Sequence, residues 1–528
     1  MNKKVMKSLK NRCNIYIYIY IFIYLIIAAF YLWMAAQVPY THDDWDWGLP
    51  IGMEQFLHAT ANSRYVGNFF EIVMTRSEFL KTVIMGTTYF LIPYLLVQIA
   101  AAEQGIVEPG QKLLLFLLCN CMLLTMNHIM WREVYGWTAG FANFGMSALF
   151  LLLWLKELLK AFDSELAAKR DSPGKVILYL VAGFYGQLFI ENLAIYCVLL
   201  ACVMCGICFF RFRRIPCRVI TMGIGAVGGL FVMFSSSLYQ TLFSIGSAVG
   251  GYRKIPIFES ESFSYVVSAF IVQAGALVAK LYCNNVVLSM LVLVVFLRRL
   301  RCKKEKTTIK FYTIFMCFNY ILLIAFAVWY FYDRQAAEDL IVTNYLQWVL
   351  SNFCQVMISG IYFCVITIEV FCCFEGKTRE KLLALWVSPP LIIMPLLVTT
   401  EIGQRLFFTT NIAVLLFLLL SISDLLGATE ALSVQRIGAL CICAAMFLFG
   451  FYGYLYSEIG ESKAERTSMI EAAVKSGQET IVLPAFPHKD YLHFPDPIDN
   501  WRIPYFKAFY GIPADIELVF ESLEQSAD

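Results

Sequence analysis

The chain has 528 residues, of which 59% are hydrophobic, 16% aromatic and only 15% charged. Soluble globular domains carry about 25% charged residues, so this composition excludes a soluble enzyme and predicts a polytopic membrane protein. The 41 Lys and Arg against 39 Asp and Glu leave a formal charge of +2. This near-balance gives the protein no large positive electrostatic potential that would attract nucleic acid, so no nucleic-acid partner is expected.

The amino-terminal segment combines basic residues with a long apolar run. Five Lys and Arg lie within the first 12 residues, and an uninterrupted apolar run follows from Ile15 to Ala36. This run is longer than the roughly 7 to 15 apolar residues of a cleavable signal peptide. We therefore expect a retained first helix whose amino terminus is cytoplasmic.

Twelve further apolar runs predict additional membrane spans, about thirteen in all, and hence an all-α polytopic membrane protein. They lie near residues 82–101, 111–130, 141–160, 175–190, 191–210, 219–238, 275–298, 309–331, 346–374, 383–400, 405–422 and 437–456. Two regions leave alternatives open. Residues 176–210 can form two short helices, and residues 263–297 can form a surface helix followed by one span.

The distribution of basic residues predicts the orientation, because Lys and Arg gather in short cytoplasmic loops. Alternate threading of the spans places the basic clusters at 156–175, 211–218, 298–310 and 377–381 on the side of the amino terminus. The opposite side receives a long first loop over 37–81 and a polar tail. We predict a multi-pass plasma-membrane protein with a transmembrane module over 1–456 and a small extracytoplasmic carboxyl-terminal region over 457–528.

The most unusual polar segment follows the first helix. Asp43, Asp44 and Asp46 alternate there with Trp45 and Trp47. Clustered carboxylates can hold a divalent cation such as Mg or Mn, or repel one another until one accepts a proton. Indole rings beside them offer a platform for a sugar ring, although acidic and Trp residues also mark membrane interfaces.

Other polar groups are predicted on the same outer side. Arg64, within the sequence Asn-Ser-Arg-Tyr-Val-Gly-Asn (62–68), and Arg405, which begins a late span, are each suited to bind an anionic group. Glu191 and Asn192 interrupt a long apolar stretch, which makes them candidates for a functional site. Snorkelling Arg side chains and a helix cap are the simpler interpretations.

Aromatic residues also recur on this side. Trp131 and Trp137 belong to a Trp-Arg-Glu-Val-Tyr-Gly-Trp turn between two spans, where an aromatic belt at the membrane interface is the simpler interpretation. Trp501, Tyr505 and Tyr510 lie in the carboxyl-terminal region. This region is predicted to contain a helix over 462–475 and a short apolar segment over 480–483, and to pack on the outer loops. Its aromatic residues either present an acceptor glycan or anchor the region.

These motifs together resemble the GT-C superfamily of membrane glycosyltransferases that use polyprenyl-phosphate sugars. The resemblance rests on HDDWDWG (42–48) directly after the first helix, then SRYVGN (63–68), WREVYGW (131–137), the EN pair (191–192) and the late outer Arg. It implies a GT-C-like helical bundle. More narrowly, these motifs are similar to a bacterial branch of largely uncharacterised GT-C-like proteins tied to surface-glycan modification.

The resemblance also implies roles for individual residues. Asp43 or Asp44 would be the catalytic base, and Arg64 or Arg405 would hold the lipid phosphate. The other residues implied are Glu191, Asn192, Trp45, Trp131 and Trp137 for substrate binding, and Asp44 with Asp46 for a metal.

The implied reaction moves a sugar, with inversion, from a polyprenyl phosphate to a cell-surface glycan or lipid-linked acceptor on the extracytoplasmic face. Two other functions are weighed against it. One is a transporter or flippase of lipid-linked sugar, and the other is a non-catalytic partner in cell-envelope glycan assembly. Transporters often show internal repeats and broken helices at the bilayer midplane, whereas the ionisable residues here concentrate at predicted outer span ends.

Overall fold

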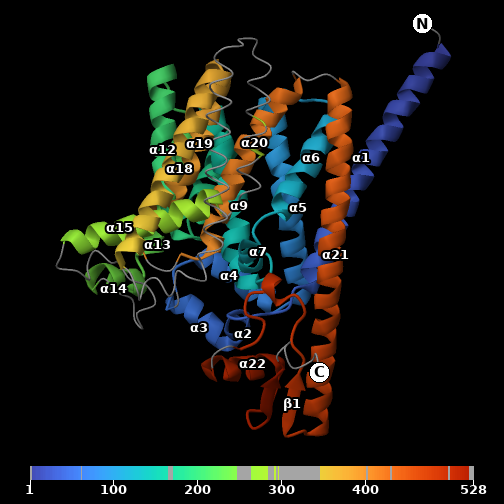
Figure 1. Cartoon of the computed structure of the whole chain (residues 1–528), viewed down its shortest axis with the longest axis vertical. Coiled ribbons are helices and arrows are strands. Elements are labelled where there is room, and N and C mark those ends of the chain that lie inside the picture. The colour runs from blue at the N-terminus through green and yellow to red at the C-terminus, as the bar shows by residue number, and fades with distance from the viewer. Residues whose placement is uncertain are drawn as a thin grey trace. The chain divides into compact units, whose positions relative to one another are not determined.

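The computed structural model describes residues 3–60, 62–163, 171–245, 263–283, 291–292, 295, 345–399, 402–427, 431–497 and 500–521 (Figure 1). The chain forms two compact units. The first comprises residues 1–54, 69–145 and 429–528, and the second comprises residues 55–68 and 146–428.

The described residues include nine helices that are long and apolar enough to cross a membrane. They are Ile17–Gln37, Glu78–Glu103, Thr138–Lys160, Glu191–Phe212, Cys217–Phe234, Asn352–Cys373, Gly376–Val398, Gln404–Leu425 and Arg436–Ser476. A bent pair of helices would make a tenth span. The chain is therefore a predominantly helical, multi-pass membrane protein, as predicted from its apolar runs.

The predicted number of thirteen spans is not reached in the part of the chain that the structure describes. The run at 309–331 lies outside the described residues, and the run at 275–298 is described only in part. The run at 175–190 forms a helix of 13 residues, α11 (Pro173–Tyr185), which is shorter than a typical membrane span of about 20 residues.

The run predicted as a straight span over 111–130 is interrupted. Helix α6 (Pro109–Leu124) ends before Thr125, and α7 (His128–Val134) turns away from it by 97°. The Asn127 side chain accepts a hydrogen bond from the Ile129 backbone N–H at 2.8 Å. This is the side-chain cap of a new helix, so the break has a local cause in the sequence.

The first unit contains the amino-terminal helix, the first loop and the carboxyl-terminal region. Besides α6 and α7, its helices are α1 (Lys3–Gln37), α2 (Asp44–Gly48), α5 (Glu78–Glu103), α8 (Thr138–Gly140), the π-helical turn η1 (Phe141–Gly145), α21 (Ala431–Ser476), the short 3₁₀ turns η7 (Lys489–Tyr491) and η8 (Asn500–Arg502), and α22 (Ile503–Tyr510). Helices α3 (Pro50–His58) and α4 (Tyr65–Thr75) lie where the chain passes between the units.

Helix α21 has 46 residues and continues without a break through residue 456 (Figure 1). The helix predicted over 462–475 is thus the end of a much longer one. The apolar segment predicted at 480–483 is strand β1 (Thr480–Leu483), which pairs in parallel with β2 (Glu517–Phe520). These two strands form the only sheet among the described residues.

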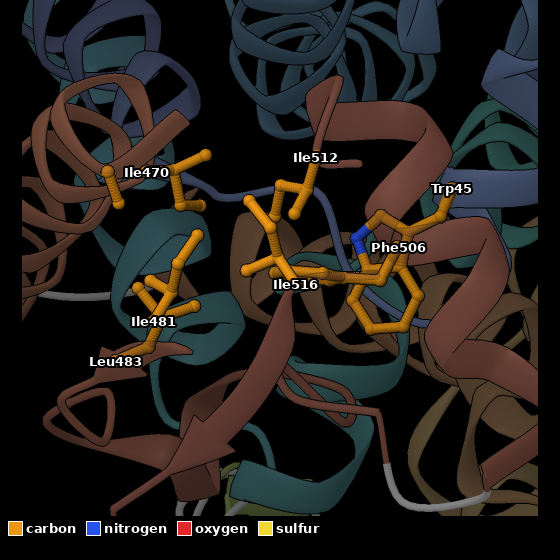
Figure 2. Packing of buried hydrophobic residues seen from close by; sticks show 8 residues of the cluster. Trp45, Ile470, Ile481, Leu483, Phe506, Ile512 and Ile516 are labelled. Carbon is orange, nitrogen blue, oxygen red and sulfur yellow. The ribbon is translucent and has the colours of Figure 1, made fainter. Parts of the chain in front are cut away.

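A hydrophobic cluster joins the carboxyl-terminal region to the first loop (Figure 2). Trp45 from α2 packs there with Phe506 of α22, their ring centroids 5.1 Å apart. The other buried members come from α21, β1 and the segment that follows α22: Ile470, Ala473, Ile481, Leu483, Ile512 and Ile516. The tail therefore packs on the first loop, which confirms that part of the prediction.

The second unit contains α9 (Met146–Lys160), α11, α12 (Glu191–Phe212), α13 (Cys217–Phe234), α14 (Ser237–Ile245), α15 (Phe263–Val278), the π-helical turn η4 (Ala279–Cys283), α18 (Tyr345–Cys373), α19 (Gly376–Ile393), the 3₁₀ turns η5 (Met394–Val398) and η6 (Gln404–Phe407), and α20 (Phe408–Gly427). Helices α11 and α13 pack so closely that their backbones are in contact. A Cβ atom on Gly225 would lie 2.2 Å from the Leu180 carbonyl oxygen. Small residues at helix contacts permit this close packing in membranes.

Candidate site in the first loop

The carboxylate of Asp44 is fully buried and binds backbone N–H groups. Its Oδ2 accepts a hydrogen bond from the Thr41 N–H at 2.9 Å, and its Oδ1 accepts one from the Ala139 N–H at 2.9 Å. The Ala139 N–H belongs to the first turn of the helix that begins at Thr138, so it has no partner within that helix. Asp44 therefore joins the first loop to the start of this helix.

Burial changes the acidity of Asp44. Desolvation raises the pKa of this carboxyl to about 7, although the backbone hydrogen bonds from Thr41 and Ala139 act in the opposite direction. A carboxyl with this pKa could accept a proton near neutral pH. In this structure its complete burial leaves no surface for direct contact with a substrate.

Asp43 has a different environment, because its side chain is 33% exposed. The Arg502 Nη1 donates to its Oδ1 at 3.0 Å, and the His42 Nδ1 contacts the same oxygen. Burial alone would raise the pKa of Asp43, but the charges and hydrogen bonds of His42 and Arg502 hold it below its usual value. Of the two predicted catalytic acids, Asp43 is the one that a substrate can reach.

His42 connects Asp43 to a group of stacked rings. Its backbone has φ +53°, a conformation that non-glycine residues rarely adopt and that is often found at functional sites. The imidazole lies 5.1 Å from the His493 ring and 5.6 Å from the Trp137 ring, between centroids. Trp137 in turn stacks on His493 at 4.1 Å.

The exposed edge of the site comes from the carboxyl-terminal region. The Trp501 side chain is 57% exposed, and the Arg502 guanidinium lies 4.3 Å from its ring centroid. The Arg502 Nε is buried and has no hydrogen-bond partner in the described part of the chain. A carboxylate, a guanidinium and an exposed indole thus lie together, a set suited to hydroxyl groups and the apolar face of a sugar ring.

Sequence reasoning did not assign His42, His493 or Arg502 to the site. His42 belongs to the HDDWDWG motif, and this position next to Asp43 could have marked it as a site residue. Arg502 is 459 residues from Asp43. No local pattern indicates a contact over that separation.

The three Trp residues predicted to bind substrate are buried. Trp45 lies in the hydrophobic cluster with no exposed surface. The Trp131 Nε1 donates to the Tyr456 hydroxyl at 2.8 Å, and its ring stacks on Tyr135. With Trp137 stacked on His493, all three serve as packing residues in this structure, and Trp501 is the exposed indole near Asp43.

Arg64 and Glu191 bind each other in the second unit. The Arg64 Nη2 donates to Glu191 Oε2 at 2.9 Å, and its Nε donates to Oε1 at 3.1 Å. The Tyr239 hydroxyl also donates to this carboxylate. A two-bond contact of this kind is a strong ion pair, so a phosphate at Arg64 would share it with Glu191.

Asn192 and Arg405 also belong to the second unit. The Asn192 Nδ2 donates to the Ile392 carbonyl at 3.2 Å. Its Oδ1 has no hydrogen-bond partner among the described residues. Arg405 is half-buried in η6.

The predicted metal site does not fit the observed donors. Asp44 directs both oxygens at backbone N–H groups. Asp46 is two residues further along the same short helix, and side chains at this spacing do not face each other. The described residues contain no group of three His, Cys, Asp or Glu able to hold a metal ion.

Comparison of the chain with protein-family models, with curated proteins and with solved structures gave no match.

Proposed function

We propose that this protein is a membrane glycosyltransferase of the GT-C type. It would move a sugar from a polyprenyl phosphate to a cell-surface glycan or lipid-linked acceptor on the extracytoplasmic face. Support comes from the acidic motif directly after the first apolar helix. The observation that carries the proposal is Asp43, accessible and held between His42 and Arg502 beside the exposed Trp501.

In the proposed reaction, the His42–Asp43 pair accepts the proton of an acceptor hydroxyl. A histidine oriented by a carboxylate is a common general base. The acceptor oxygen forms a bond to the anomeric carbon as the bond from that carbon to the phosphate oxygen breaks. The phosphate leaves with the electron pair, and the anomeric configuration inverts.

The leaving phosphate needs positive charge nearby. The resemblance to GT-C enzymes gives this role to Arg64 or Arg405, of which Arg64 binds the Glu191 carboxylate in this structure. Arg502, which donates to Asp43 through Nη1, would orient the acceptor through its remaining donors. No step of this reaction is routed through a metal ion.

The test compares the surface glycan of the native cells with and without this protein, by mass and linkage analysis. Loss of one sugar substituent, restored by the wild-type chain, is the expected result. Asp43→Asn and His42→Gln should fail to restore it. Asp490→Asn, an exposed acid elsewhere in the carboxyl-terminal region, is the control and should restore it.

Membrane levels and detergent stability of each variant must match those of the wild type for this comparison. A glycan that is unchanged when the protein is absent would contradict the function itself. Restoration by well-folded Asp43→Asn would retain the function and exclude this base.

A further inference from the structure

Helix α18 has two contrasting faces. Where its side chains are described, the exposed large ones are all apolar: Phe353, Met357, Ile361, Ile368 and Phe371. Its buried face carries Asn352, Gln355, Ser359, Tyr362 and Glu369. This pattern is the reverse of a soluble amphipathic helix and fits a membrane span whose polar residues face the protein interior.

The spacing of the buried polar residues places them on one face. Asn352, Gln355, Ser359 and Tyr362 follow one another at intervals of three and four residues, and Glu369 lies seven residues beyond Tyr362. Residues at these intervals line one side of a helix. Helix α18, labelled in Figure 1, packs against α15, η4 and α19 within the second unit.

Glu369 is the carboxylic acid of this face, and its side chain is only 1% exposed. Neither carboxyl oxygen has a hydrogen-bond partner in the described part of the chain, and the same is true of the Ser359 Oγ and the Gln355 Oε1. Glu157 in α9 provides a contrast, because its carboxylate binds both Arg218 and Lys160. Glu369 is therefore a buried carboxyl without a compensating charge among the described residues.

The charged groups on the elements packed against α18 have other partners. Helix α15 carries no charged residue. The Lys280 ammonium of η4 donates to the Ile402 carbonyl. The charged residues of α19 are accounted for elsewhere: Lys377 and Lys381 pair with Asp163, Glu380 pairs with Arg211, and Arg379 lies over the Phe371 ring.

An ionised carboxylate in such a place would lack both water and a counter-charge, which is strongly unfavourable. We propose that Glu369 is an intramembrane proton-binding site, with an exchangeable proton on its carboxyl at neutral pH. The ligand of this site is a proton, which binds the Glu369 carboxyl on the polar face of α18. The proposal is independent of the glycosyl transfer at the first loop.

Infrared spectroscopy of the purified full chain in lipid tests this proposal. A protonated carboxyl has a C=O stretching band that a carboxylate lacks. Asp44, whose pKa is about 7, also contributes to this band at neutral pH. One component of the band should therefore be lost in Glu369→Gln but retained in Asp44→Asn, and should move to lower frequency in heavy water. Glu375→Gln, an exposed carboxyl just beyond α18, is the matched control and should retain the band.

Glu369→Asp serves if the Gln variant fails to fold, because it keeps a carboxyl in the same place. It should retain a protonated-carboxyl band at an altered frequency. Three results would overturn the proposal: no such band in the wild type at neutral pH, a band unchanged in Glu369→Gln, or a band insensitive to heavy water. A metal cation bound to an ionised Glu369 would produce the first of these results.

Discussion

Replacement of Asp44 by Asn tests whether this carboxyl is buried with a raised pKa. The Asn side chain has the shape of a protonated Asp, with one acceptor oxygen and one donor group, but it cannot ionise. Asp44→Asn therefore removes one titration. It also replaces one of the two acceptor oxygens by an NH2 group, at a cost in stability that does not depend on pH. The prediction concerns how the stability difference between variant and wild type changes with pH.

The magnitude follows from the pKa of Asp44, which desolvation raises from 3.8 to about 7 in the folded protein. Between about pH 4 and pH 7 the folded state holds a proton that the unfolded state releases, so wild-type stability falls as pH rises through this window. The two pKa values correspond to about 4 kcal/mol. Asp44→Asn should therefore gain about 4 kcal/mol relative to wild type between about pH 4 and pH 8.

Thermal unfolding of the full chain in detergent measures this change at each pH. For a chain of this length the unfolding entropy is roughly 1.1 kcal/mol/K. The Tm difference between variant and wild type should therefore change by about 4 °C across this pH range. Thr138→Val is the control, because it alters the same buried site without removing a titratable group. It should shift Tm by the same amount at every pH. A constant difference for Asp44→Asn as well would refute the assignment of a buried, desolvated carboxyl.

Three further predictions concern packing and pairing. Trp45→Ala should cost about 3 to 5 kcal/mol of stability, seen as a lower thermal transition in detergent, because it opens a cavity in the hydrophobic cluster; an unchanged transition would contradict the burial of this ring. Arg64→Gln and Glu191→Gln should each cost roughly 3 kcal/mol, and the double variant should cost less than their sum in a thermal double-mutant cycle, because each single change leaves a charge unpaired; additive losses would argue against the pair. Gly136→Ala should cost about 1 to 3 kcal/mol in the same assay, because its Cβ would lie 2.0 Å from the Tyr491 carbonyl oxygen; a neutral effect would show that this contact is looser.

The membrane class was predictable because an apolar run long enough to span a bilayer is a local property of the sequence. The break between α6 and α7 was also signalled locally, by Asn127 at a favourable capping position. The length of the apolar run predicts a straight span there, because run length takes no account of capping. The apolar segment at 480–483 was predictable, and it forms strand β1. Its partner β2 begins only at Glu517, and no local pattern indicates that the two strands pair.

The candidate site was predictable only in part. The acidic motif marked Asp43 and Asp44, but nothing in it distinguishes the accessible carboxyl from the buried one. That difference arises from Arg502 and from the backbone of Ala139, both distant in sequence. For the same reason, the isolated Glu191 gave no sign of its partner Arg64, which lies 127 residues earlier.

Helix α21 explains why the first loop depends on the far end of the chain. Its 46 residues give a length of roughly 69 Å, about twice the hydrocarbon thickness of a bilayer. One part must therefore extend beyond the membrane, and its residue Ile470 packs in the cluster with Trp45. Lys463 on the same helix donates to the Ala36 carbonyl at the end of α1. Because Arg502 belongs to the region that α21 supports, the Asp43–Arg502 pair depends on a helix that is also anchored in the membrane.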